Sequence, residues 1–133
     1  MDRLIVMVGT NDGKEIVFDH PGDADYFFIY EVSKNGYKLL RKVKNTAKDM
    51  EEKHGGRKKM EKVLELVGDI DVILTRRKSP NLIRMAKETT IQPIMVDVVS
   101  IDDGLKIISE NFESVAKTIE RRKEGERFDI LKM

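Results

Sequence analysis

The sequence predicts a single-domain α/β protein with a mixed five-stranded sheet, an antiparallel hairpin portion and three helices. Three observations support this fold class. An Asn-Gly dipeptide separates two runs with strand character in the first half, which is typical of a β-hairpin. In the second half, short apolar runs alternate with helical patterns, which indicates strands joined by crossover helices. The chain has 133 residues, enough for one hydrophobic core.

The first half is expected to supply the antiparallel part of the sheet. Residues 3 to 8 (RLIVMV) end at Gly9 and are typical of a central strand. Residues 24 to 32 and 37 to 43 flank the Asn-Gly turn, so we expect them to pair with each other. Residues 14 to 20 follow an Asp-Gly turn and are expected to return as a short strand or an extended segment.

The second half is expected to supply alternating helices and strands. Apolar residues recur at helical spacing from 60 to 67, and a strand buried on both faces covers 72 to 75. A second helix begins at Pro80, and a further strand covers 92 to 98. Apolar steps of three and four residues from 101 to 119 predict one long amphipathic helix. The seven methionines are expected to fill the core.

The C-terminal end of the chain is richer in charged residues than the segment before it. We expect residues 1–120 to form the domain and residues 121–133 (RRKEGERFDILKM) to form a charged C-terminal tail. Because the tail is rich in charge, we expect it to be loosely held, with Phe128, Ile130 or Leu131 packing against the domain.

Charge and composition exclude several classes of function. The chain has 25 basic and 24 acidic residues and a net charge of +1, which argues against nucleic acid as a partner. The sequence contains no cysteine, which excludes disulfides, a cysteine nucleophile and thiolate ligation of a cluster. No apolar run reaches the roughly 20 residues that cross a bilayer, so we expect a cytoplasmic protein without membrane contact. A charged fraction of 37% favours a thermophilic source.

A basic turn between a strand and a helix is the first candidate site. Arg76, Arg77 and Lys78 follow the buried strand, and Ser79 and Pro80 begin the next helix. Ligands of parallel α/β sheets gather at the carboxyl ends of strands, and a helix N-terminus there favours anions. The turn is therefore either an anion-binding site or a solvated basic loop.

A histidine among acidic residues is the second candidate. His20 is close in sequence to Asp19, Asp23 and Asp25, and imidazole and carboxylate groups together can hold a divalent cation. Pro21 and the adjoining glycine favour the other interpretation, an ordinary acidic turn. We prefer the turn, because no complete metal-binding motif is present.

No pattern in the chain indicates catalysis. Thr10, Ser79 and Ser100 lack the glycine-framed turn of a nucleophilic serine, and neither histidine belongs to a recognisable triad. The glycine-rich runs lack the spacing of a phosphate loop or a dinucleotide-binding fingerprint. We therefore expect a protein that binds a ligand without acting as an enzyme.

Several short patterns resemble one known protein family. Residues 18–32 (FDHPGDADYFFIYEV) resemble a family segment with a phenylalanine, a glycine and a strand written like ARYFLIYEV, and residues 69–81 (DIDVILTRRKSPN) look like its GVDVVITGGIGPN. Further matching features are the Asp12-Gly13 turn, Asn45, the His54-Gly55-Gly56 loop and the IQPIMV strand. Over roughly residues 3 to 118, the chain thus resembles the dinitrogenase iron-molybdenum cofactor biosynthesis family, which includes NifX-like proteins and the carboxyl-terminal domain of NifB-like proteins.

This resemblance implies a ribonuclease-H-like α/β fold and, for some members, a carrier or scaffold that binds an iron–sulfur metallocluster precursor. We therefore expect a non-catalytic NifX-like protein that binds or carries an iron–sulfur or molybdenum-type cofactor precursor, together with a protein partner in cofactor assembly. The alternative is a regulatory module that kept the fold and lost the cofactor, and recognises an anion, a nucleic acid or a protein.

The resemblance and the basic turn together define the predicted binding residues. His54 is the predicted metal ligand. The predicted cofactor-binding residues are His54, Gly55, Gly56, Arg76, Arg77, Ser79 and Asn81. The sequence departs from the family pattern where Arg76, Arg77 and Lys78 replace loop glycines. We expect the histidine loop and the basic turn to border one shared pocket.

Overall fold

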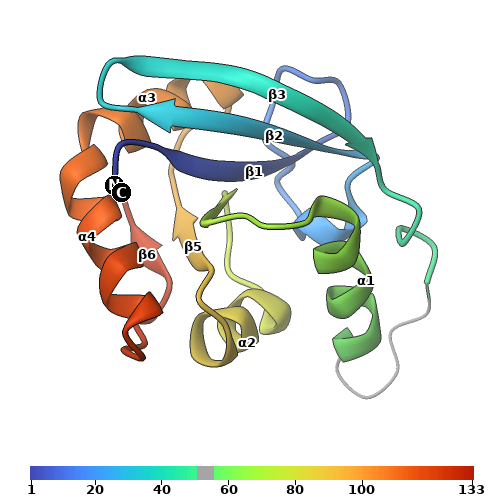
Figure 1. The fold of residues 1–133 in the computed structure, drawn as a ribbon. Helices are drawn as coiled ribbons and strands as arrows, with labels where there is room; N and C mark the ends of the chain where they lie inside the picture. Colours follow the sequence, from blue (N-terminus) through green and yellow to red (C-terminus); the bar gives the residue numbers. More distant parts are fainter. Residues whose placement is uncertain (51–55) are drawn as a thin grey trace.

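A mixed sheet organises the computed structural model, which describes residues 1–50 and 56–133 (Figure 1). Within these residues the sheet has six strands in the order β3-β2-β1-β4-β5-β6. Strand β2 is antiparallel to both of its neighbours, whereas β1, β4, β5 and β6 run parallel to one another. The strands are β1 (Leu4–Thr10), β2 (Tyr26–Ser33), β3 (Gly36–Lys44), β4 (Val72–Thr75), β5 (Gln92–Met95) and β6 (Leu131–Lys132).

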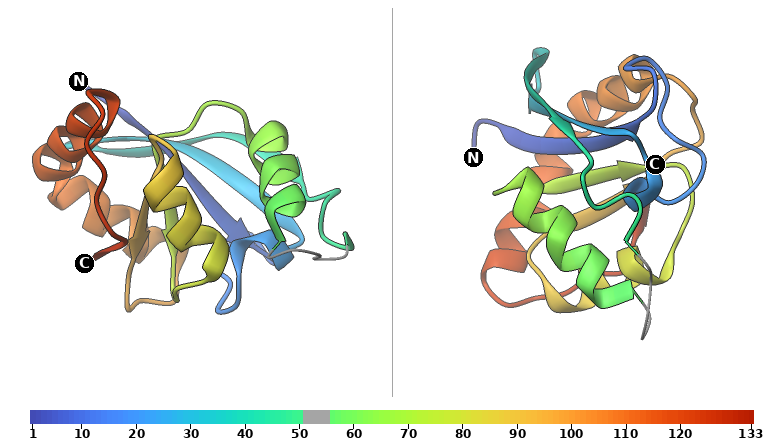
Figure 2. Two further views of the ribbon diagram at one scale, coloured as in Figure 1. Left: turned by 90° about the horizontal axis from the view of Figure 1, so that it is seen from below. Right: turned by 90° about the vertical axis from the view of Figure 1, so that its right-hand side faces the viewer.

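Helices cover both faces of this sheet, as Figure 2 shows. They are the short 3₁₀ turn η1 (Pro21–Asp23) and the α-helices α1 (Arg57–Val67), α2 (Pro80–Glu88), α3 (Ile101–Glu110) and α4 (Phe112–Lys123). Side chains alternate along β1, so that Val6 and Val8 pack with α3 and α4, while Met7 packs with α1 and α2. The described residues thus form one α/β domain with a hydrophobic core on each face of the sheet.

The structure has one strand and one helix more than the sequence predicts. The five predicted strands are present, and the sixth comes from the C-terminal segment, where β6 pairs in parallel with β5. The prediction of a loosely held tail is therefore wrong, whereas the expected packing of Ile130 and Leu131 on the domain is confirmed. The segment from 14 to 20 does not join the sheet as a strand; it forms an isolated bridge between Glu15 and Ser100 and buries Ile16.

The predicted long helix is divided at Asn111. The side-chain Nδ2 of Asn111 donates to the Ile107 carbonyl oxygen at 2.8 Å, and its backbone has φ −108° and ψ 22°. Asparagine side chains compete in this way with the backbone pattern of a helix. The apolar stripe continues across the break, because Ile108, Phe112 and Val115 all pack against the same face of the sheet. The periodicity therefore predicted the buried face correctly and missed the interruption.

The hairpin between β2 and β3 forms as predicted, with its turn shifted by one residue. Ser33 pairs with Gly36, so the two-residue turn is Lys34-Asn35, and Gly36 begins β3 with φ +144°. Strand β3 is the outer strand of the sheet, and most of its side chains, including Lys38 and Lys42, are exposed.

The buried guanidinium of Arg122 joins α4 to α2, β5 and the C-terminal segment. Its Nη2 donates to the carbonyl oxygens of Ala86 and Thr89 at 2.7 Å, at the carboxyl end of α2. Its Nη1 donates to Gln92 Oε1 at 2.9 Å and to the Phe128 carbonyl oxygen at 3.2 Å. Desolvation by burial lowers the pKa of Arg122 to about 10, so the side chain stays protonated at neutral pH.

We expect Arg122→Met to lower the free energy of unfolding by at least about 3 kcal/mol, because each buried carbonyl oxygen left without a donor costs roughly 1–3 kcal/mol. The neighbouring Arg121 is half exposed and pairs with Glu126 at 2.5 Å, so Arg121→Met should cost about 1 kcal/mol or less. Urea unfolding of the two variants measures both changes. Equal losses would contradict the role given to Arg122.

Candidate functional site

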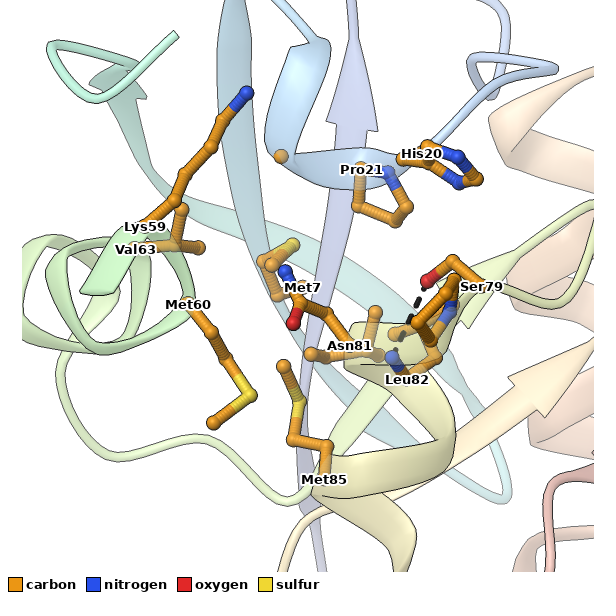
Figure 3. A pocket seen from close by; sticks show the side chains of 13 residues that line it. Met7, His20, Pro21, Lys59, Met60, Val63, Ser79, Asn81, Leu82 and Met85 are labelled. Atoms are coloured by element: carbon orange, nitrogen blue, oxygen red, sulfur yellow. Dashed lines mark hydrogen bonds between the residues drawn. The ribbon is translucent and has the colours of Figure 1, made fainter. Parts of the chain in front are cut away.

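A cavity of about 180 Å³ lies between α1, α2 and η1, at the carboxyl ends of β1 and β4 (Figure 3). This is the edge of the sheet where ligands of parallel α/β proteins gather. Thirteen residues line the cavity. They are Met7, His20, Pro21, Gly22, Lys59, Met60, Val63, Ile73, Ser79, Pro80, Asn81, Leu82 and Met85. Among these lining residues none is acidic.

Three methionines form much of the cavity wall. Met7 comes from β1, Met60 from α1 and Met85 from α2, and they are 0%, 6% and 4% exposed. Figure 3 shows the side chains of Met60 and Met85 extending toward each other from their two helices. The prediction that methionines fill the core is confirmed for these three and is wrong for Met1 and Met50, which are exposed. The three buried methionines also give the cavity a surface of polarizable thioether sulfur.

Polar groups lie at the margins of the cavity. His20 lies beside Pro21 and faces the β4–α2 turn at Ser79 (Figure 3). Its Nδ1 is buried and has no hydrogen-bond partner within residues 1–50 and 56–133. The stem of Lys59 lines the cavity, while its ammonium points away from Met60 and bonds Asp23 Oδ1 at 2.5 Å.

The loop from β1 to His20 is fixed by backbone contacts. Asp12 Oδ1 accepts hydrogen bonds from the backbone N–H groups of Glu15 and Lys14 at 2.9 Å, and these bonds lower the pKa of the Asp12 carboxyl. At the end of β1, a Cβ atom on Gly9 would lie 3.1 Å from Pro21 Cα. Glycine at this position therefore allows η1 to pack closely on β1, which places His20 at the cavity.

The start of α2 forms as the sequence predicts. Ser79 is the N-cap, and its Oγ accepts a hydrogen bond from the Leu82 backbone N–H at 3.2 Å. Pro80 occupies the first helical turn. Asn81 Nδ2 donates to the Gly56 carbonyl oxygen at 3.3 Å. Gly56, the last residue of the predicted histidine loop, thus contacts Asn81, a predicted binding residue of α2.

The predicted binding residues fall into three groups. Ser79 and Asn81 line the cavity, and Gly56 contacts Asn81. Arg76 and Arg77 lie outside the cavity lining; their guanidinium carbons are 5.0 and 5.4 Å from the centre of the exposed Phe18 ring. His54 and Gly55 lie outside the described residues, so their part in the site stays a prediction.

The acidic cluster around His20 does not form a cation site. Asp19 pairs with Arg77, Asp23 with Lys59 and Asp25 with Lys48. Within the described ranges, no three His, Cys, Asp or Glu side chains are grouped to hold a metal ion. The preferred interpretation of this segment as an acidic turn agrees with η1.

Sequence reasoning missed three contributors to the cavity. The wall formed by Met60 and Met85 could have been found from the helical phase of α1 and α2, which turns both toward the sheet. Lys59 belongs to the same buried face of α1. The burial of the His20 Nδ1 atom, where His20 faces the β4–α2 turn, has no signal in the local sequence.

Comparison of the sequence with models of known protein families shows which family the chain belongs to. The family model described as dinitrogenase iron-molybdenum cofactor matches residues 2–111. The chain belongs to the dinitrogenase iron-molybdenum cofactor family. Membership connects it with the biosynthesis or binding of that cofactor. The match includes every residue that lines the cavity and ends before α4 and β6.

The fold of this family member is also found in a solved structure. That structure, determined at 1.70 Å, is the "putative dinitrogenase" of Methanocaldococcus jannaschii. The two chains are 18% identical, the alignment covers 84% of this chain and 92% of the other, and the TM-score is 0.56. At this identity the likeness supports the fold alone. No curated protein matches the sequence significantly.

The helices of the described residues do not include a membrane span, because none combines sufficient length with sufficient apolar character.

We expect Ser79→Ala and Ser100→Ala each to lower the free energy of unfolding by about 1 kcal/mol, because each removes an N-cap hydrogen bond. Ser79 borders the cavity and Ser100 does not. Only Ser79→Ala should therefore shift the methyl NMR signals of Met60 and Met85. Equal shifts in the two variants would show that the cap does not shape the cavity.

Proposed function

We propose that this protein binds and carries an anionic iron–sulfur or molybdenum-type cofactor precursor in the methionine-lined cavity, without catalysing a reaction. The observation that supports this most is the combination of a thioether wall with the unpartnered Nδ1 of His20. Membership of the iron-molybdenum cofactor family supports this chemical class of cargo. The cargo is a substrate that the protein takes up and releases.

The available side chains suit a weakly held cluster. The chain contains no cysteine, so thiolates cannot hold the cargo. A neutral imidazole is a good ligand for iron, and Nδ1 of His20 is the buried nitrogen that has no other bond. The apolar surface of Met60 and Met85 suits the sulfide faces of a cluster, because such a shell excludes water from the metal. Weak attachment is what a carrier requires.

Charge around the cavity favours an anionic cargo. None of the described residues that line the cavity carries a carboxylate, and the N-terminus of α2 opens onto it beside Ser79. Arg76 and Arg77 lie on the same edge of the sheet, stacked on Phe18.

The predicted ribonuclease-H-like fold and the predicted cytoplasmic protein partner belong to the same proposal. The strand order β3-β2-β1-β4-β5, with β2 antiparallel to its neighbours, supports the ribonuclease-H-like architecture. A cytoplasmic protein partner in cofactor assembly would receive the cargo.

The second candidate function is an anion-binding module that uses the basic turn. It is favoured by the stacking of Arg76 and Arg77 on an exposed ring outside the cavity, which holds both guanidinium groups at the surface. This module would bind its ligand without any contribution from His20.

Anaerobic reconstitution with iron and sulfide tests the proposal. We expect the wild-type protein to retain iron and visible absorbance after gel filtration, and His20→Ala to weaken retention about tenfold or more, the scale typical of a damaged metal site. His54→Ala tests the ligand predicted from sequence in the same assay.

The control is the double variant Arg76→Gln and Arg77→Gln, which changes charge outside the cavity lining. If His20→Ala retains iron but this double variant does not, the binding site is the basic turn and not the cavity. Absence of iron in the wild-type protein would refute the carrier function.

A further inference from the structure

We propose that the basic end of β3 binds an extended segment of a partner protein as an additional strand of the sheet, and that acidic and apolar residues alternate along this segment. The site is residues 41–44 (RKVK), outside the lining of the cavity. The inference goes beyond the proposed cargo and does not depend on it. It follows from the free backbone groups, the side chains and the charge of this end of β3.

The backbone of β3 is the first argument. Strand β3 lies at one edge of the sheet, and within the described residues it pairs with β2 alone (Figure 1). Just past its end, the Asn45 N–H donates to the Asp25 carbonyl oxygen at 3.0 Å. Bonded residues alternate along an antiparallel pair of strands, so Lys42 and Lys44 direct their N–H and C=O groups away from β2.

Most of these outward groups are free. The Lys44 carbonyl oxygen accepts a hydrogen bond from the Thr46 N–H at 3.1 Å. Within residues 1–50 and 56–133, the outward N–H of Lys44 and both outward groups of Lys42 have no hydrogen-bond partner. An added strand would bond these three groups, which is how sheet edges bind extended peptides.

The two lysine side chains set the charge of the partner. Lys42 lies opposite Phe28 and Lys44 opposite Tyr26, so both project from the face of the sheet that carries Phe28. The Lys42 ammonium is 5.2 Å from the centre of the Phe28 ring. Neither lysine has an ion-pair partner among the described residues, and β3 contains no acidic residue. Two acidic side chains at alternate positions of an added strand would face both lysines.

Val43 sets the character of the residue between the two acidic positions. Its side chain is half-buried on the opposite face of the sheet, where it packs with the cluster that includes Phe27. Because successive side chains of a strand alternate, the middle residue of the partner would lie beside Val43. An apolar residue suits that position. On the lysine face, Tyr26 is 41% exposed and offers a further apolar contact.

A bulge in β3 limits the length of the paired segment. The partners of Ile29 and Tyr30 are Arg41 and Leu39, so Leu40 is an extra residue between them. A bulge disrupts the ladder, so the added strand would not continue past it in the same register. Leu39 and Leu40 are 41% and 45% exposed and can contact apolar residues of the partner beyond the paired segment.

A polypeptide fits this edge better than a nucleic acid does. The outward carbonyl oxygen of Lys42 needs a hydrogen-bond donor, and a peptide backbone supplies one at every residue except proline. Phosphate groups of a nucleic acid accept hydrogen bonds and would pair with the ammonium groups alone. An acidic strand satisfies the lysines and the backbone of β3 together.

The test titrates the whole chain, labelled with ¹⁵N, with a blocked peptide of sequence TEVEVT. We expect the amide NMR signals of Lys42 and Lys44 to shift and their hydrogen exchange to slow, because both N–H groups gain a bond. The N–H groups of Arg41 and Val43 already face β2, so their exchange should change less.

Two control peptides separate strand addition from attraction between charges. The first has lysine in place of both glutamates and should not bind. The second carries N-methyl groups on both glutamates and on the valine between them. It keeps its negative charge and loses the donors that an added strand needs, so it should also fail to bind.

Matched protein variants test the lysines. Lys42→Glu should weaken peptide binding about fivefold or more, because an attractive pair becomes a repulsive one. Lys117→Glu makes the same change of charge on the exposed surface of α4 and should leave the affinity within about twofold. If circular dichroism shows that Lys42→Glu does not fold, Lys44→Glu reverses the neighbouring charge.

Slowed exchange at Lys42 and Lys44 with the acidic peptide alone supports the proposal. Equal binding of either control peptide would overturn it, and so would equal losses in the variants of Lys42 and Lys117. The absence of any shift at millimolar concentrations of the acidic peptide would overturn it as well. A short single-stranded DNA that shifts these amides when the peptide does not would replace the protein partner by a nucleic acid.

Discussion

The buried guanidinium of Arg122 is the interaction on which the arrangement of this protein depends. A charged group without solvent is unfavourable unless its donors are satisfied, and Arg122 satisfies them with carbonyl oxygens of α2, with Gln92 of β5 and with Phe128. One side chain therefore holds a helix, a strand and the C-terminal segment together. Its positive charge also lies at the carboxyl end of α2, where the helix dipole is negative.

The consequence for the site is geometric. Helix α2 presents Ser79 and Asn81 at one end of the cavity and Met85 along its wall, while Arg122 fixes the opposite end of the same helix. Arg122 belongs to α4, beyond residue 111, where the match to the family model ends. A segment outside the shared family region thus supports the part of the fold that family members have in common.

Elements that depend on residues close in sequence could be predicted. Elements that depend on contacts between residues far apart in sequence could not. The Ser79 cap, the hairpin near Gly36 and the buried strand β4 depend on neighbours in sequence, and each formed close to its predicted position. Strand β6 has two residues and no pattern of its own. It pairs with β5, and Arg122 bonds both Gln92 of β5 and the Phe128 carbonyl oxygen just before β6. The same limit applies to the site, since α2 was predicted from local signals, whereas the position of His20 against the β4–α2 turn joins segments far apart in the sequence.

The position of β3 at one edge of the sheet has a consequence for how copies of this protein behave at high concentration. A long outer strand offers unpaired backbone groups that can recruit another strand and start a fibril. Here Lys38, Lys42 and Lys44 project from that strand and are exposed. Repulsion between these lysines would oppose pairing of two such edges, which also expose Leu39 and Leu40.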